Sequence, residues 1–164
     1  MVPRWIGSLD NLQDLSLSIE QLGVADFGLL GSLNALSSLS LLVLIEVADR
    51  SSSSQGTQRV KISGTHGFPS LRRFLVGSIS CAFGLLFEGG AMPKLQELFL
   101  TFNSDITGSL TNGEFDFGIQ HLPCLALVGC NFDRPEHPAW VALEKATSSH
   151  PNHPKLHRTN LPYW

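Results

Sequence analysis

The chain has 164 residues, of which 43% are hydrophobic and 15% are charged. This composition is typical of one globular domain with its own core and excludes a disordered chain. The formal net charge of −3 at pH 7 offers no basic surface of the kind that nucleic-acid-binding domains carry, so we expect no nucleic acid partner.

No segment has the features of a secretory signal or a membrane span. The N-terminal sequence lacks an apolar run, and the longest nearly uncharged stretch, "FLVGSISCAFGLLF", has only 14 residues, too few to cross a bilayer. Three cysteines without a C-x-x-C pair argue against a disulfide framework and against a zinc site. We therefore expect a cytoplasmic protein with no membrane span.

A leucine pattern begins at Leu9 and recurs along the chain. In "LDNLQDLSL" the apolar residues are separated by steps of three, three and two, and similar copies are "LNALSSLSL", "FPSLRRFLV", "MPKLQELFL" and "IQHLPCLAL". The intervals between the copies are 24, 35, 24 and 27 residues, measured between Leu12, Leu36, Leu71, Leu95 and Leu122. Three of the four lie within the period of roughly 20–29 residues that is typical of leucine-rich repeats.

The steps of two predict short strands, and the steps of three predict a turn that leads into each strand. Stacked coils of this kind bury their leucines against each other and pair their strands into a parallel sheet. We therefore predict an α/β leucine-rich-repeat solenoid of about five repeats in residues 1–132, with a curved parallel β-sheet on the concave face and an irregular or short-helical convex side. The alternative, a bundle of amphipathic helices, would not need the step of two. The predicted core rows are Leu15, Leu39, Phe74, Leu98 and Leu125, and Leu17, Leu41, Val76, Leu100 and Leu127.

The long interval and the two ends depart from the repeat. The polar segment "DRSSSSQGTQ" near 49–58 is interpreted as a surface loop inserted into one coil, either regulatory or tolerated slack. Apolar spacing and flanking prolines predict a helix from about Pro138 to Ser148, within a C-terminal helical cap at 133–150 in which Trp140 and Leu143 cover the last coil. Residues 151–164 are predicted to be a tail. The first coil has no comparable cover, so we expect a C-terminal part of something longer or a truncated gene product.

The sequence offers no catalytic or metal-binding constellation. His150, His153 and His157 could share a helix face and bind metal, but Pro151 and Pro154 interrupt any helix there, so we interpret them as a solvated tail. No nucleophile elbow, no His-Glu-x-x-His and no phosphate-binding loop occurs, which predicts a protein that is not an enzyme and needs no cofactor and no metal. A structural role is expected for Cys130.

Several segments resemble the C-terminal leucine-rich repeats of plant intracellular immune receptors, the coiled-coil, nucleotide-binding disease resistance proteins of grasses. They include "PRWIGSLDNLQDLSLSI", "AMPKLQELFLTF" and "ALEKATSSHPNHPKL", and the resemblance covers about Val2 to Leu156. It implies a protein-recognition and autoinhibition module of the defence response, in a fragment that lacks the nucleotide-binding domain. The implied partner is that domain of the full receptor, or a pathogen effector or host target. The alternative is a leucine-rich-repeat adaptor, such as the substrate-recognition domain of a ubiquitin ligase.

Strand residues between the inward leucines are predicted to point to the concave face. This face changes from polar in the first coil to apolar in the middle coils, where it is flanked by two charged residues, and such a patch often marks a contact site. In the fifth coil the predicted concave residues are Cys124, Ala126 and Val128. The alternative is that these side chains merely pack on one another. The predicted protein-binding residues are Leu42, Arg73, Leu75, Glu97, Phe99 and Thr101.

Overall fold

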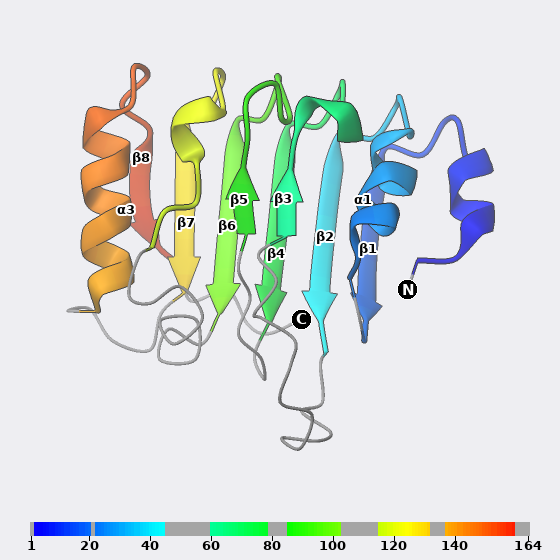
Figure 1. Ribbon diagram of the computed structural model, residues 1–164, viewed down its shortest axis with the longest axis horizontal. Helices are drawn as coiled ribbons and strands as arrows, with labels where there is room; N and C mark the ends of the chain where they lie inside the picture. Colours follow the sequence, from blue (N-terminus) through cyan, green and yellow to red (C-terminus); the bar gives the residue numbers. More distant parts are fainter. Residues whose placement is uncertain are drawn as a thin grey trace.

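The computed structural model describes residues 2–20, 22–44, 60–78, 85–102, 115–131 and 137–159. Within these ranges, six strands form one parallel sheet in which each strand lies beside the next one along the chain (Figure 1). Each turn of the chain thus adds one strand, as in a solenoid. In sheet order the strands are β1 (Asp14–Ile19), β2 (Ser38–Val43), β4 (Arg73–Ser78), β6 (Glu97–Phe102), β7 (Leu127–Asn131) and β8 (Lys155–Arg158).

Short elements cover one face of this sheet, which we call the inner face; the opposite face is the outer face. Most of them lie in front of the large sheet in Figure 1, while η1 lies beyond α1 and β1 at the right end, and they pack with the sheet in one hydrophobic cluster. This arrangement confirms the predicted α/β solenoid, with a parallel sheet on one side and short helices on the other. The covering elements are η1 (Arg4–Ser8), α1 (Val24–Gly31), β3 (Val60–Ile62), η2 (Gly64–His66), β5 (Leu85–Phe87), η3 (Ile119–His121) and α3 (Pro138–Ser149). β3 and β5 pair in parallel as a small second sheet.

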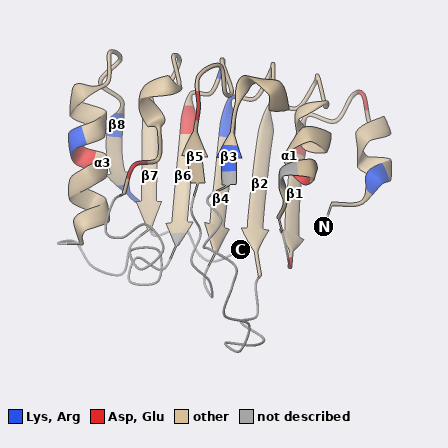
Figure 2. Ribbon diagram, in the orientation of Figure 1, with Lys and Arg blue, Asp and Glu red and all other residues tan. Residues whose placement is uncertain are grey.

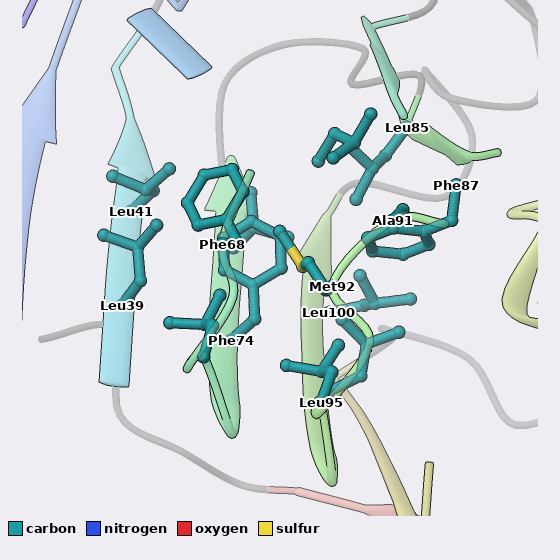
Figure 3. Close-up of a cluster of buried hydrophobic side chains, with 14 of the residues drawn as sticks. Leu39, Leu41, Phe68, Phe74, Leu85, Phe87, Ala91, Met92, Leu95 and Leu100 are labelled. Atoms are coloured by element: carbon teal, nitrogen blue, oxygen red, sulfur yellow. The ribbon is translucent and has the colours of Figure 1, made fainter. Parts of the chain in front are cut away.

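The core forms where alternate strand residues point to the inner face. Figure 3 shows this cluster, to which β2, β4 and β5 contribute Leu39, Phe74 and Phe87, all 0% exposed. The rings of Phe74 and Phe87 meet edge to face with their centroids 6.4 Å apart, a favourable aromatic geometry. Alternate residues of β2 and β4, beginning with Leu39 and Phe74, therefore point into the core.

Backbone hydrogen bonds hold successive coils in register. Four carbonyl oxygens, each just before a strand, accept two N–H groups from the start of the next strand, at distances of 2.8–3.0 Å; they belong to Gln13, Ser37, Arg72 and Gln96. Because the same pair of bonds recurs from β1 to β7, the coils stack as repeats of one unit.

The fifth coil has a different register from the one that the sequence predicts. β7 pairs with β6 so that Val128 lies opposite Leu98 and Cys130 lies opposite Leu100. Val128 and Cys130 are buried, whereas Leu127 is half-buried and belongs to the outer face. The interval from Leu98 to Val128 is therefore 30 residues, not 27. The predicted rows are wrong in this coil, because Val128 and not Leu125 lies beside Leu98, although Leu125 is buried, and Leu127 is not a core residue.

This error has a simple physical origin. Apolar residues occur at every third position through the turn, at Ile119, Leu122, Leu125 and Val128, and all four are buried. A shift of three residues therefore places apolar side chains on apolar positions, and the repeat template cannot distinguish the two registers.

The first coil is less covered than the others. Leu9 is 38% exposed, and Leu12, Leu15 and Leu17 are only half-buried. Ile6 of η1 is 2% exposed, so η1 packs into the core, whereas the leucines of β1 stay half-buried.

The C-terminal end contains more structure than the sequence predicts. α3 forms as expected, with Leu143 buried and Trp140 half-buried against the core. The predicted tail, however, contains β8, which pairs in parallel with β7 and places Leu156 opposite Val128. Lys155–Arg158 is thus a sixth strand of the sheet, which the sequence did not reveal because Leu156 is its one apolar residue. The predicted loop near 49–58 lies outside the described residues.

His150 is buried and contacts the preceding coil, so the prediction that it belongs to a solvated tail is wrong. The residue is 1% exposed, and its Nε2 lies 3.1 Å from the carbonyl oxygen of Leu122. Its Nδ1 accepts the N–H of Asn152 at 3.1 Å. The imidazole Nε2–H therefore donates a hydrogen bond to the Leu122 carbonyl. His150 lies six residues before Leu156, the position that holds a large apolar residue in the preceding coils, namely Leu33, Phe68, Met92 and Leu122.

We expect His150→Phe to lower the free energy of unfolding by about 0.5–1.5 kcal/mol, because the Leu122 carbonyl, which also accepts the N–H of Leu125 at 3.2 Å, would lose the imidazole as its second donor. Urea denaturation followed by circular dichroism measures this loss. His157→Phe is the matched control, since His157 is exposed on β8, and it should change stability by no more than about 0.5 kcal/mol. Equal effects of the two substitutions would contradict the assigned bond.

Candidate functional site

The outer face consists of three rows of side chains that cross the strands. β-sheet pairing places each residue directly beside its neighbour on the next strand, which fixes the rows without reference to the leucine template. The first row is Asp14, Ser38, Arg73, Glu97, Leu127 and Lys155; the second is Ser16, Ser40, Leu75, Phe99, Gly129 and His157; the third is Ser18, Leu42, Gly77, Thr101 and Asn131. All six predicted protein-binding residues lie on this face, on β2, β4 and β6, and we call them the β2–β6 patch.

Arg73 and Glu97 form an ion pair at the start of β4 and β6. They are opposite each other in the ladder, and Arg73 Nε donates to Glu97 Oε2 at 2.6 Å. Their side chains remain 58% and 34% exposed, so the pair contributes only about 0.2–1 kcal/mol to stability. Its main effect is to hold one positive and one negative group in fixed positions on an accessible surface. Few other charged residues lie along these strands in Figure 2, so the pair is the main charged feature there.

Leu75 and Phe99 occupy the centre of the patch. They face each other across β4 and β6, and both are half-buried. The Phe99 ring extends over Gly129 of β7, where a Cβ atom would overlap the ring and lie 2.9 Å from the Thr159 methyl carbon. Gly129 therefore provides the space in which the Phe99 ring lies, with one side on the sheet and the other accessible.

Leu42 and Thr101 complete the patch on either side of Gly77. A Cβ atom on Gly77 would lie 3.1 Å from the Cβ of Thr101, so Thr101 leans into the space above the glycine. Beside Leu75, the Oγ atom of Ser40 is shielded from solvent and has no hydrogen-bond partner among the described residues. Polar groups in this state are rare in folded proteins, and this one adjoins the patch.

The outer face extends further than the sequence predicts. Because the register of β7 differs, its outer residues are Leu127, Gly129 and Asn131 instead of Cys124, Ala126 and Val128. β8 then adds Lys155 and His157 beside them. One feature of the sequence indicates this register of β7: a glycine follows two apolar residues in "LVGC". A glycine inside a strand often marks the close approach of another side chain.

The cysteines and histidines are dispersed. Burial raises the pKa of the Cys130 thiol to about 12, so this thiol stays protonated and packs as a small apolar group. Cys124 is exposed before β7. Among the described residues, no three His, Cys, Asp or Glu side chains lie close enough together to hold a metal ion. The β2–β6 patch combines accessible apolar side chains with an aligned ion pair, an arrangement that suits recognition of another molecule.

Comparisons with known proteins agree with this geometry at the level of the fold. The model of the family described as "Leucine-rich repeat region" matches residues 1–156. No curated protein and no solved structure gives a significant match. Across the described ranges, none of the helices has the length and apolar character needed to cross a membrane.

Proposed function

The chain belongs to the leucine-rich repeat family, and we propose that it is the protein-recognition and autoinhibition module of an intracellular plant immune receptor, acting in the cytoplasm. Repeat proteins of this type bind other proteins on the extended face of their sheet. The proposal assigns that role to the β2–β6 patch, and it takes the partner class from the resemblance of the repeats to those of plant immune receptors.

The observation that carries the proposal is the Leu75–Phe99 pair beside the aligned Arg73–Glu97 ion pair. Interfaces concentrate their binding energy in a few well-supported anchors, often aromatic, that become desolvated on association. Phe99 meets this description because its ring is already positioned over Gly129 and loses little freedom on binding. Charged groups at the rim govern orientation and partner choice more than affinity, which is the role proposed for Arg73 and Glu97.

The partner proposed for the resting state is the nucleotide-binding domain of a receptor of this class; a pathogen effector or host target would compete for the same patch. A contact between the two modules would hold the receptor inactive until the competitor displaces it. The second candidate, a ubiquitin-ligase adaptor, rests on the same patch. Genomic sequence upstream of Met1 separates the two, since a phosphate-binding loop supports the receptor and an F-box-like helical segment supports the adaptor.

We expect the double substitution Phe99→Ala, Leu75→Ser to weaken binding of the separately supplied nucleotide-binding domain at least about 30-fold, the equivalent of about 2 kcal/mol. Isothermal titration calorimetry measures the affinity. The control is Ser16→Ala, Ser18→Ala, which removes two exposed hydroxyls from the same face on β1 and should leave affinity within about threefold.

Two outcomes would contradict the proposal. If the nucleotide-binding domain does not bind the unsubstituted chain, the autoinhibitory role is wrong. If it binds and the Phe99, Leu75 variant retains both its circular dichroism spectrum and its affinity, the β2–β6 patch is not the contact surface.

A further inference from the structure

The hydroxyl of Ser40 is a polar group that the fold itself does not use. Its Oγ atom is shielded from solvent and has no hydrogen-bond partner within the described ranges. β2 pairs with β1 on one side and with β4 on the other, so the backbone groups around Ser40 bond to the neighbouring strands. A hydroxyl that has lost water without gaining a protein partner carries a desolvation cost. The stability of the free chain therefore does not account for this hydroxyl.

Ser40 is placed where a molecule on the outer face can reach it. The residue is half-buried and lies beside Leu75 of β4 in the second row. Rotation about its Cα–Cβ bond moves Oγ between staggered positions, so the side chain can turn its hydroxyl towards a molecule on that face. Adjacent strands lie about 4.8 Å apart. A partner that covers Leu75 and Phe99 therefore also covers Ser40.

Asp14 provides a second hydrogen-bond acceptor on the same part of the outer face. It is exposed and lies opposite Ser38, one row away from Ser40. In the part of the chain that the structure describes, no Lys or Arg forms an ion pair with its carboxylate. The Cα atoms of Asp14 and Ser40 are about 8 Å apart, from the spacing of strands and the rise along them. Two acceptors without donors, one of them anionic, therefore lie together beside the apolar centre of the patch.

We propose, on the basis of the function assigned above, that the partner of the β2–β6 patch contributes an arginine whose guanidinium bridges the Asp14 carboxylate and the Ser40 hydroxyl. An arginine has five N–H donors in a planar fork and no acceptor, and its hydrogen bonds to a carboxylate are charge-assisted. A lysine ammonium is a compact point charge and spans a shorter distance between its acceptors. Arg73 of β4 is already paired with Glu97, so it opposes a second cation only weakly.

Ser40→Ala is expected to have opposite effects on the free chain and on the complex. The unfolding temperature of the complete 164-residue chain should not fall, because the substitution removes a hydroxyl without a partner. Binding of the separately supplied nucleotide-binding domain should weaken about 10-fold in calorimetry, or about 1.4 kcal/mol. Ser18→Ala makes the same chemical change at an exposed position of β1, and this control should leave affinity within about threefold.

A double-mutant cycle tests whether one group of the partner contacts both residues. Asp14→Asn removes the charge at nearly constant shape and should weaken binding about 10-fold. Combined with Ser40→Ala, it should weaken binding by no more than about 30-fold, instead of the roughly 100-fold expected of independent residues. The effects of Asp14→Asn and Ser18→Ala should multiply, since Ser18 has no part in the proposed contact.

Each other outcome has a definite meaning. A lower unfolding temperature in Ser40→Ala than in Ser18→Ala would assign the hydroxyl to the fold, and independent effects of Asp14 and Ser40 would exclude a shared arginine. If Phe99→Ala, Leu75→Ser weakens binding and Ser40→Ala does not, the arginine contact is wrong while the proposed function stands. If the nucleotide-binding domain does not bind the unsubstituted chain, both are wrong.

Discussion

Leu98→Ala is expected to lower the free energy of unfolding by about 2–5 kcal/mol. Leu98 is 0% exposed and lies in β6 between Phe74 of β4 and Val128 of β7. Its truncation removes apolar contacts on both sides and leaves a cavity, which the flanking strands cannot fill because backbone hydrogen bonds fix their spacing. Guanidinium denaturation measures the loss, and a value well under about 1 kcal/mol would contradict the stacking of the coils.

The control for this substitution also tests the register of the fifth coil. Leu127→Ala truncates a half-buried leucine on the outer face, and it should cost no more than about 1 kcal/mol. In the register expected from the sequence, Leu127 would instead belong to the core and its loss would match that of Leu98. Similar losses at Leu127 and Leu98 would therefore favour the 27-residue interval over the observed one.

The fold could be predicted from the sequence wherever the step of two is unambiguous. In the second, third and fourth coils the template places Leu39, Phe74 and Leu98 in one row, and the observed pairing has the same row. It failed in the fifth coil because apolar residues recur every three positions there, so a shift of three residues still places apolar side chains on buried positions. The structure selects the register in which Gly129, instead of Ala126, lies beneath the Phe99 ring.

The sixth coil was missed for a different reason. His150 fills a core position, but it does so with a hydrogen bond to Leu122, and no search for leucines can find a histidine that satisfies a buried carbonyl. β8 likewise joins the sheet through backbone bonds from Lys155 and Thr159 to β7 and the turn before it, which its polar sequence does not reveal. The β2–β6 patch was predictable because alternation alone determines which strand residues face outward. The contact of the Phe99 ring with Gly129 was not predictable, since it depends on the register of β7.

Gly31→Ala is expected to destabilise the protein by about 1–3 kcal/mol or more. Gly31 ends α1, and its carbonyl oxygen accepts the N–H of Phe68 at 3.0 Å. A Cβ atom at this position would overlap the carbonyl oxygen of His66 in η2 and lie 3.2 Å from a ring carbon of Phe68. Because the obstacle is backbone, no rotamer change can relieve it, and the second and third coils would have to separate.

Gly28→Ala in the same helix provides a control of opposite sign. Gly28 is exposed, and no atom lies within 4 Å of a Cβ built on it, so alanine should stabilise α1 by about 0.5–1 kcal/mol through its higher helix propensity. Thermal unfolding of both variants measures the two changes under one set of conditions. Helix propensity alone would raise the melting temperature in both. A decrease confined to Gly31→Ala would therefore isolate the backbone contact between α1 and η2, and an increase in both variants would contradict it.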